Sequence, residues 1–257
     1  MTTREAIKLL LRSPRLFLAA CLSHAPLFLQ SQMDIRPESP WHNPDFLRGY
    51  GGFFTPGDVP PGRLSDLEPW DNVRRDMLLL LLRTIQERNV EGDFAEVGVY
   101  KGLTARLIHY YAPSRRLHLF DTFEGFTERG SERELETTDT RVSATSFADT
   151  NLEAVTRHIG PQNSNVVFHS GYFPDSIPSE LSLRRFAFVH LDADLFEPVL
   201  EGLRFFYPRL NSGGMIVIHD YNAWPGARKA VDEFMSDKPE FPIPMPDKSG
   251  SAVIVKS

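Results

Sequence analysis

Residues 186–191, with the sequence Phe-Ala-Phe-Val-His-Leu, decide the fold, and the acidic sequence Asp-Ala-Asp follows them at 192–194. A strand that is apolar on both sides is typical of a parallel sheet covered by helices on both faces. Further strands are expected at 94–99, 117–121, 166–169 and 215–219, with helices at 104–111, 151–159, 197–207 and 227–235. This alternation predicts an α/β fold with a doubly wound, mostly parallel, Rossmann-like sheet. Two last strands, at 241–244 and 252–255, bring the number to seven as an antiparallel hairpin.

The composition is that of a globular protein of 257 residues with a formal net charge of −6. Nucleic-acid-binding domains are normally basic, so this charge argues against a nucleic-acid partner. A single cysteine, Cys21, excludes an intramolecular disulfide and a cysteine-based zinc site. We therefore expect a cytoplasmic protein. Of the 19 Phe residues, those in strands (Phe94, Phe186 and Phe188) are expected to lie in the core.

The chain is expected to divide into an N-terminal helix and lid region, residues 1–70, and a sheet domain, residues 71–257. The apolar stretch at 16–29 is interrupted and too short to span a membrane, and no cleavage site of a signal peptide follows it. We expect a helix that packs on the protein or joins subunits into a homo-oligomer, rather than one that contacts a membrane surface. A second helix is expected over 70–87, with Asp71 as its N-cap.

The first strand leads into a turn with spaced glycines: Glu96, Val97 and Gly98, then Tyr100 and Gly102. A dinucleotide fingerprint has a third glycine between these two. The side chains that stand there instead obstruct a pyrophosphate at the start of the following helix. The motif therefore favours a ligand without phosphates, although an ordinary strand-turn-helix connection is the alternative.

The second strand ends in Asp121, whose carboxylate can accept hydrogen bonds from a ribose diol. An adenosine-type ligand without a pyrophosphate indicates S-adenosylmethionine. Glu96 can then bind the amino group of this cofactor through a charge-assisted hydrogen bond.

Loops after the second and third strands carry further candidates for cofactor binding: Thr122 and Phe123, then Gly171, Tyr172 and Phe173. The rings can flank the adenine or the sulfonium, and backbone groups of the third-strand loop can meet the adenine edge. The alternative is that the rings belong to the hydrophobic core.

The fourth and fifth strands end in a group of acidic residues and a histidine: Asp192, Asp194, His219 and Asp220. Adjacent parallel strands place such residues within a few ångströms of one another, where carboxylates repel unless a cation or a proton intervenes. Oxygen ligands favour Mg²⁺, which could chelate two hydroxyls of an acceptor while a further carboxylate takes the proton. Helix N-caps and a hydrogen-bonded histidine are the alternative.

Several motifs, in this order, resemble those of the macrocin O-methyltransferase family, which includes the mycinamicin and novobiocin sugar O-methyltransferases. They are Glu-Val-Gly-Val at 96–99, Asp-Thr-Phe-Glu-Gly-Phe at 121–126, His-Leu-Asp-Ala-Asp-Leu-Phe-Glu-Pro at 190–198, Tyr-Pro-Arg-Leu at 207–210, Trp-Pro-Gly-Ala at 224–227 and Ala-Val-Asp-Glu-Phe at 230–234. The resemblance implies a class I methyltransferase that uses S-adenosylmethionine and Mg²⁺ to methylate a sugar hydroxyl of a glycosylated natural product.

The resemblance also implies roles for single residues. Asp192 and Asp220 would bind the metal, and Asp194 would be the general base. The family usually has Asp-Asp-Tyr where this chain has His219, Asp220 and Tyr221. His219 could bind the metal, shift its preference to another divalent ion, act as the base, or mark a site of weaker Mg²⁺ binding.

The family uses its N-terminal region as a lid over the acceptor, and this part of the chain departs from the family pattern. Trp41 and Tyr50 are the candidate lid residues, with ordinary loop or core aromatics as the alternative. Two other functions stay open: a nicotinamide-dependent oxidoreductase, and a cofactor-binding scaffold with a degenerate site.

Overall fold

The computed structural model describes residues 71–160 and 164–257, and all of these belong to one compact unit, Gly62–Ser257. The predicted N-terminal helix and the lid candidates Trp41 and Tyr50 lie outside the described residues. The division of the chain at residue 70 therefore stays a prediction.

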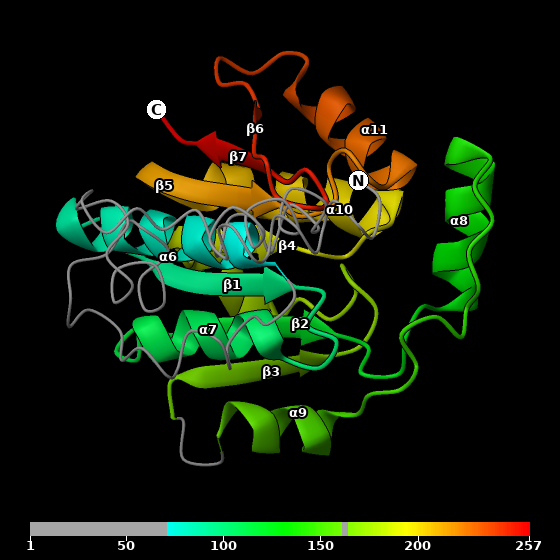
Figure 1. Ribbon diagram of the computed structural model, residues 1–257, viewed down its shortest axis with the longest axis horizontal. Helices are drawn as coiled ribbons and strands as arrows, with labels where there is room; N and C mark the ends of the chain where they lie inside the picture. The colour runs from blue at the N-terminus through cyan, green and yellow to red at the C-terminus, as the bar shows by residue number, and fades with distance from the viewer. Residues whose placement is uncertain (1–70, 161–163) are drawn as a thin grey trace, which may run out of the picture. The chain divides into compact units, whose positions relative to one another are not determined.

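Seven strands form the centre of this unit: β1 (Asp93–Val97), β2 (Leu117–Asp121), β3 (Val166–Ser170), β4 (Phe186–Leu191), β5 (Leu210–Ile218), β6 (Ile243–Pro244) and β7 (Ala252–Val255). They form one sheet in the order β3-β2-β1-β4-β5-β7-β6. The first five strands are parallel, and β7 runs antiparallel to both β5 and β6 (Figure 1). This confirms the predicted mostly parallel sheet and its antiparallel hairpin at one edge.

Helices cover both faces of the sheet: α6 (Asn72–Glu87), α7 (Leu103–Tyr111) and α9 (Leu152–Ile159) on one side, α10 (Phe196–Phe206) and α11 (Pro225–Met235) on the other (Figure 1). Two short 3-10 helices each precede a strand: η2 (Ser179–Leu183) precedes β4, and η3 (Tyr207–Arg209) precedes β5. Within the described ranges, no helix combines the length and the apolar character needed to cross a membrane.

Strand β4 lies at the centre of the core, and all six of its residues are buried. Val189 and Leu191 pack into the hydrophobic cluster beneath α10 and α11. Side chains alternate along a strand, so His190 faces the opposite side of the sheet. Glu96 of β1 is its partner in the strand register. The apolar run therefore places two buried polar groups side by side in adjacent strands.

Helix α6 begins at the predicted N-cap, Asp71. One carboxylate oxygen of Asp71 accepts hydrogen bonds from the backbone N–H groups of Val73 and Arg74, at 3.0 and 3.1 Å. The other accepts from the N–H of Lys248, in the connection between β6 and β7, at 2.8 Å. This anchors the first turn of α6 near the end of β5 and fixes the position of Arg74.

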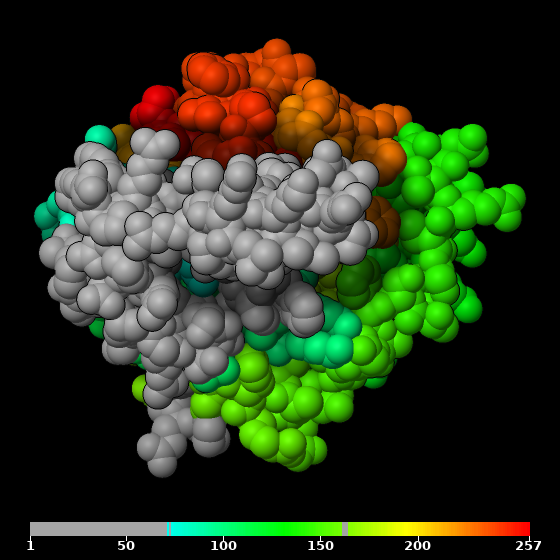
Figure 2. Space-filling model, viewed as in Figure 1, coloured from blue at the N-terminus to red at the C-terminus, as the bar shows by residue number. Residues whose placement is uncertain are grey.

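Helix α8 (Glu128–Thr138) was not expected from the sequence, because Leu135 is its only aliphatic residue. Glu134 holds it in place: this side chain is fully buried and accepts a hydrogen bond from the backbone N–H of Phe196, at the start of α10, at 2.8 Å. A Cβ on Gly226 would lie 2.3 Å from the same carboxylate. Figure 2 shows the surface of α8, in green, beside that of α11, in orange.

Replacing Glu134 tests this anchor. Glu134→Ala leaves the N–H at the start of α10 without its charged acceptor, and we expect the free energy of unfolding to fall by about 2 kcal/mol. The matched control is Glu136→Ala on the same helix, whose exposed ion pair with Arg133 contributes about 0.5 kcal/mol or less. Urea unfolding measures both, and equal stability of the two variants would show that Glu134 is not the anchor.

Candidate functional site

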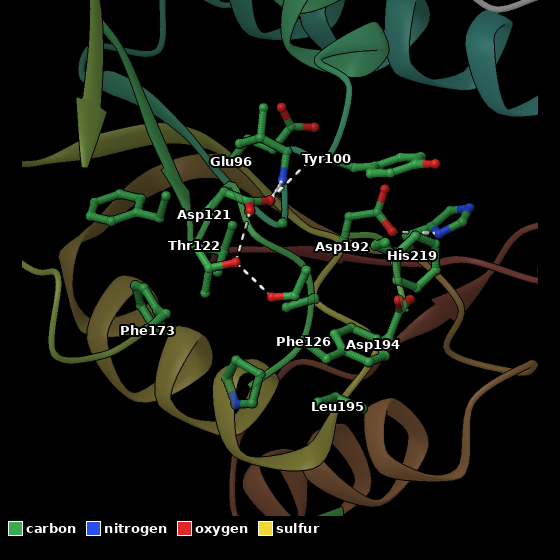
Figure 3. A pocket seen from close by; sticks show the side chains of 18 of the residues that line it. Glu96, Tyr100, Asp121, Thr122, Phe126, Phe173, Asp192, Asp194, Leu195 and His219 are labelled. Atoms are coloured by element: carbon green, nitrogen blue, oxygen red, sulfur yellow. Dashed lines mark hydrogen bonds and ion pairs between the residues drawn. The ribbon is translucent and has the colours of Figure 1, made fainter. Parts of the chain in front are cut away.

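A cavity of about 270 Å³ opens where the carboxyl ends of the parallel strands meet, the usual position of ligand sites in open α/β sheets (Figure 3). The sequence-predicted residues that line it are Glu96, Val97, Gly98, Tyr100, Asp121, Thr122, Gly171, Tyr172, Phe173, Asp192, Asp194, His219 and Asp220. Of the predicted residues in the described part of the chain, only Gly102 and Phe123 do not line it.

The end of β1 lies directly against the end of β4. The backbone N–H of Asp192 donates to the carbonyl of Val97 at 2.8 Å. Gly98 has a φ of +85°, and a Cβ there would lie 2.1 Å from the carbonyl oxygen of Asp192. Gly98 is thus required by the contact between the two strand ends, whatever ligand the loop binds.

Asp121 organises the loop that follows β1. Its Oδ2 accepts hydrogen bonds from the backbone N–H groups of Val99 and Tyr100, at 2.6 and 2.9 Å. Its Oδ1 accepts from the N–H of Phe123 at 2.6 Å. The amides of the β1 loop, which bind phosphate in dinucleotide-binding folds, are here occupied by a carboxylate. The loop therefore opposes a pyrophosphate because its amides are already bonded, whereas the sequence prediction rested on the side chains at 99 and 100.

Gly102 and Phe123, which do not line the cavity, contribute to the packing of the fold. Gly102 has a φ of +79° at the N-cap of α7, and a Cβ there would lie 3.0 Å from the side chain of Val155 in α9. Phe123 is 3% exposed, and its ring packs against Phe168. The interpretation of Phe123 as a core aromatic, which the sequence left open, fits this position.

The loop after β3 forms a fixed wall of the cavity. The hydroxyl of Tyr172 donates to Glu197 at 2.8 Å, and the guanidinium of Arg129 lies 4.5 Å from the centre of the Tyr172 ring. Phe173 is 4% exposed, with its ring edge-on to Phe120. Both rings are held by protein contacts, so the wall keeps its shape without a ligand.

Glu96 and His190 form a fully buried pair between β1 and β4. Nδ1 of His190 lies 3.0 Å from Oε1 of Glu96. Burial, followed by the charge of Asp192, raises the pKa of Glu96 well above its usual value. Burial lowers the pKa of His190 to about 3. The pair is therefore uncharged in its stable form. Glu96 lines the cavity, and within the described part of the chain its second oxygen, Oε2, has no hydrogen-bond partner.

The carboxylate cluster is formed by Asp192, Asp194, His219 and Asp220, as the sequence predicted. Nδ1 of His219 lies 2.6 Å from Oδ1 of Asp192 and 3.0 Å from Oδ2 of Asp220. Figure 3 shows Asp192 and His219 pointing toward one another, with Asp194 nearby. Asp194 and Asp220 both have positive φ angles, +60° and +57°, which aim their side chains from the strand ends into the cavity.

The cluster separates the pKa values of its members. Burial lowers the pKa of His219, but the charge of Asp192 and close contacts with both carboxylates outweigh it and raise the pKa to about 10. Burial raises the pKa of Asp192, but His219 overcomes this and holds it well below its usual range. Burial, the charge of Asp192 and a hydrogen bond with Asp220 raise the pKa of Asp194 well above its usual value. Asp194 is thus the strongest base among the three carboxylates.

Two features of the cavity were missed by the sequence analysis. Arg74 lines it from the first turn of α6, with Nη1 2.7 Å from Nε2 of His219. Phe147 also lines it, and its ring is edge-on to those of Tyr100 and Phe126, both with centroids 5.1 Å away. Neither residue belongs to a motif, and each contacts residues that are distant from it in the sequence and come close only in the folded protein.

The donor set of the cluster fits a divalent cation. One ligand atom from each of its four residues lies within 4.8 Å of the others. Nδ1 of His219 is buried and, among the described residues, has no hydrogen-bond partner in spite of its short distances to Asp192 and Asp220. The four ligand atoms are thus close enough together to bind one ion. Carboxylate oxygens suit Mg²⁺, and the imidazole nitrogen extends the choice to Mn²⁺ and other transition ions.

A family model described as Macrocin-O-methyltransferase (TylF) matches residues 71–253, more than half of the chain. The resemblance seen in the sequence is thereby confirmed. Among solved structures, the O-methyltransferase NovP aligns with a TM-score of 0.60 and 21% identity, covering 88% of this chain and 94% of that one. At this identity the likeness shows the fold alone.

Two relatives are named as methyltransferases of glycosylated compounds. The 8-demethyl-8-(2,3-dimethoxy-alpha-L-rhamnosyl)-tetracenomycin-C 4'-O-methyltransferase of Streptomyces olivaceus is 31% identical over 170 residues, 63% of this chain and 64% of the relative. The mycinamicin III 3''-O-methyltransferase of Micromonospora griseorubida is 31% identical over 156 residues, 56% of this chain and 61% of the relative. Both matches span less than two thirds of the relative's length.

Glu96→Gln should separate stability from ligand binding. The pKa of Glu96 is raised on folding, so the protonated side chain stabilises the fold, and this contribution is lost as the pH rises above the unfolded value near 4.5. Glutamine carries no charge at any pH. We therefore expect the variant to match the wild type near pH 5 and to exceed its free energy of unfolding at pH 8.

Urea unfolding at the two pH values measures the effect of Glu96→Gln, with the exposed Glu91→Gln as the matched control. A variant less stable than the wild type at pH 8 would contradict the buried charge. We also expect Glu96→Gln to bind S-adenosylhomocysteine more weakly, by about tenfold, because the glutamine amide cannot ionise to pair with the ammonium group of the ligand as the carboxylate can.

Proposed function

This chain belongs to the macrocin O-methyltransferase family, and we propose that it is an S-adenosylmethionine-dependent O-methyltransferase. One observation carries the proposal: a single cavity joins a nucleoside-type pocket that opposes phosphate to a cluster of carboxylates with a raised pKa at Asp194. The first part suits a cofactor without a pyrophosphate. The second suits the removal of a proton from a hydroxyl group.

The cofactor would lie along the ends of β1, β2 and β3. S-adenosylmethionine supplies an electrophilic methyl group on its sulfonium centre. In this proposal Oδ1 of Asp121 receives a ribose hydroxyl on the one lone pair that the loop amides leave free, and the second oxygen of Glu96 receives the amino group. Thr122 and the loop of Gly171 and Tyr172 border the adenine. Gly98 lets the chain pass close beneath the cofactor.

The acceptor is proposed to be a sugar hydroxyl of a glycosylated natural product. This rests on the two relatives, whose names describe methylation of such compounds. The cavity supports it chemically, because polar carboxylates at its floor lie close to an aromatic rim. Phe126, which lines the cavity, has its ring edge-on to Phe147 and to Trp224 of the N-cap of α11. Carbohydrate and aglycone groups carry both polar and apolar surfaces for such a site.

We propose that Asp192, Asp220 and His219 hold a divalent cation and that Asp194 is the general base. A divalent cation supplies a Lewis acid that lowers the pKa of a bound hydroxyl. Asp194 lines the cavity beside these residues, and with a cation offsetting the carboxylate charges that raise its pKa it would be ionised and able to accept the proton of the acceptor hydroxyl. The rigid ends of β4 and β5 orient the acceptor oxygen toward the methyl group, which contributes to the rate through proximity.

The two alternative functions are less consistent with the site. A nicotinamide dinucleotide needs free amides at the β1 loop for its pyrophosphate, and the N–H groups of Val99 and Tyr100 are already bonded to Asp121. A degenerate scaffold would not need Asp194 and Asp220 in left-handed conformations that direct them into the cavity. Methyl transfer to any acceptor would exclude the scaffold.

Asp194→Asn tests the general base. The amide cannot accept the hydroxyl proton, so we expect methyl transfer to fall by about 10²-fold or more. Affinity for S-adenosylhomocysteine should stay within a factor of about three, since Asp194 lies on the acceptor side. Transfer of a labelled methyl group to rhamnosylated polyketides measures the rate, and isothermal titration the affinity. Wild-type turnover in the variant would remove Asp194 from the mechanism.

Removal of divalent cations tests the metal part separately. We expect EDTA to abolish methyl transfer, because the acceptor hydroxyl is not activated without the cation. Added Mg²⁺ or Mn²⁺ should restore the transfer. Binding of S-adenosylhomocysteine, measured in the same samples, should persist in EDTA. Full activity in EDTA would contradict the cation while leaving the methyltransferase assignment in place.

A further inference from the structure

Arg74 is a positively charged side chain inside the carboxylate cluster. It reaches the cluster from the first turn of α6, and its side chain is 15% exposed. Nη1 lies 2.7 Å from Nε2 of His219 and 3.8 Å from Oδ2 of Asp192. The guanidinium therefore stands beside two of the residues that we propose as cation ligands.

When the ring of His219 is neutral, the contact with Arg74 determines which of its nitrogens carries the proton. A guanidinium has only donors, so in the neutral ring of His219, the form that can bind a cation, Nε2 accepts the hydrogen bond from Arg74. The proton of the neutral ring then lies on Nδ1, the nitrogen that faces Asp192 and Asp220. In this state His219 presents an N–H group to the carboxylates and has no lone pair for a metal there.

A cation bound at Nδ1 of His219 requires the opposite arrangement. Nδ1 must offer its lone pair, so the proton of the ring moves to Nε2. Nε2 then faces Arg74 as a donor facing a donor at 2.7 Å, which is repulsive. The guanidinium and the cation would also compete for the negative charge of Asp192, which lies within 4 Å of Arg74.

We propose that Arg74 is the counter-ion of the carboxylate cluster and that a divalent cation displaces it from His219 on binding. Arg74 is thus a positioning residue that sets the affinity of the site for the cation. Without the cation, it balances part of the negative charge of Asp192 and holds the ring of His219 in place. The proposal rests on the cation site of the proposed function.

Mn²⁺ binding to the full-length protein tests this competition, measured by isothermal titration and by electron paramagnetic resonance without cofactor or acceptor. Arg74→Gln removes the competing charge, and we expect Mn²⁺ to bind about tenfold more tightly. Arg74→Lys keeps the charge and should bind Mn²⁺ nearly as the wild type does. The matched control is Arg83→Gln on the same helix, which removes an exposed ion pair with Glu87.

Pulsed electron paramagnetic resonance supplies a readout that a merely structural role of Arg74 would not produce. The bound Mn²⁺ should show a coupling to an imidazole nitrogen in the wild type and in Arg74→Gln, and His219→Ala should abolish it. Thermal unfolding shows whether each variant is folded.

The proposal is overturned if Arg74→Gln binds Mn²⁺ no more tightly than Arg83→Gln, if the nitrogen coupling is absent, or if no variant binds Mn²⁺. The shift in Mn²⁺ affinity does not require methyl transfer. A shift found in a protein that transfers no methyl group would therefore leave this inference standing and reject the proposed function alone.

Discussion

The contact between the ends of β1 and β4 is the constraint on which the rest of the site depends. The chain after β1 passes so close to the carbonyl of Asp192 that only glycine can stand at position 98. The same contact pairs Glu96 with His190 in the core. It also places Asp192, a proposed cation ligand, next to the loop after β1 that is proposed to bind the cofactor. One backbone approach therefore brings together the two halves of the cavity, which come from segments nearly a hundred residues apart.

Electrostatics explains why this cavity needs positive charge from several sources. Ligand atoms of Asp192, Asp194 and Asp220 lie within 4.8 Å of one another, and Asp194 and Asp220 are buried. His219 and Arg74 supply positive charge from the protein, and the proposed cation would supply more. Where the family resemblance leads us to expect an acidic residue, this chain has His219, so the cluster carries less negative charge than a fully carboxylate set. A larger share of the positive charge that offsets the carboxylates therefore comes from protein side chains, and a smaller share from the proposed cation.

Much of the sheet could be predicted from sequence, because the buried parallel strands are local apolar runs; β2, β4 and β7 have the predicted bounds. The site residues at strand ends followed from the sheet, since topology determines which ends meet. Helix α8 could not be predicted, because a single buried carboxylate rather than an apolar stripe holds it. Arg74 also escaped, because its contact with His219 joins residues 145 positions apart. Phe123 shows the remaining ambiguity, since a ring after a strand end can face the core or the cavity.

The polarity of α8 has a consequence for how this protein can diversify. Apart from Gly130 and Glu134, the residues of this helix are at least partly exposed, and the helix follows directly on Thr127, which lines the cavity. Its outer side chains can change without disturbing the sheet, the pairing of strand ends or the carboxylates. Arg129 is the exception among these exposed side chains, because it contacts Tyr172 and Glu197 in the wall of the cavity. In the proposed methyltransferase, substitutions on α8 would change the surroundings of the cavity without replacing the residues proposed for the cation and the base.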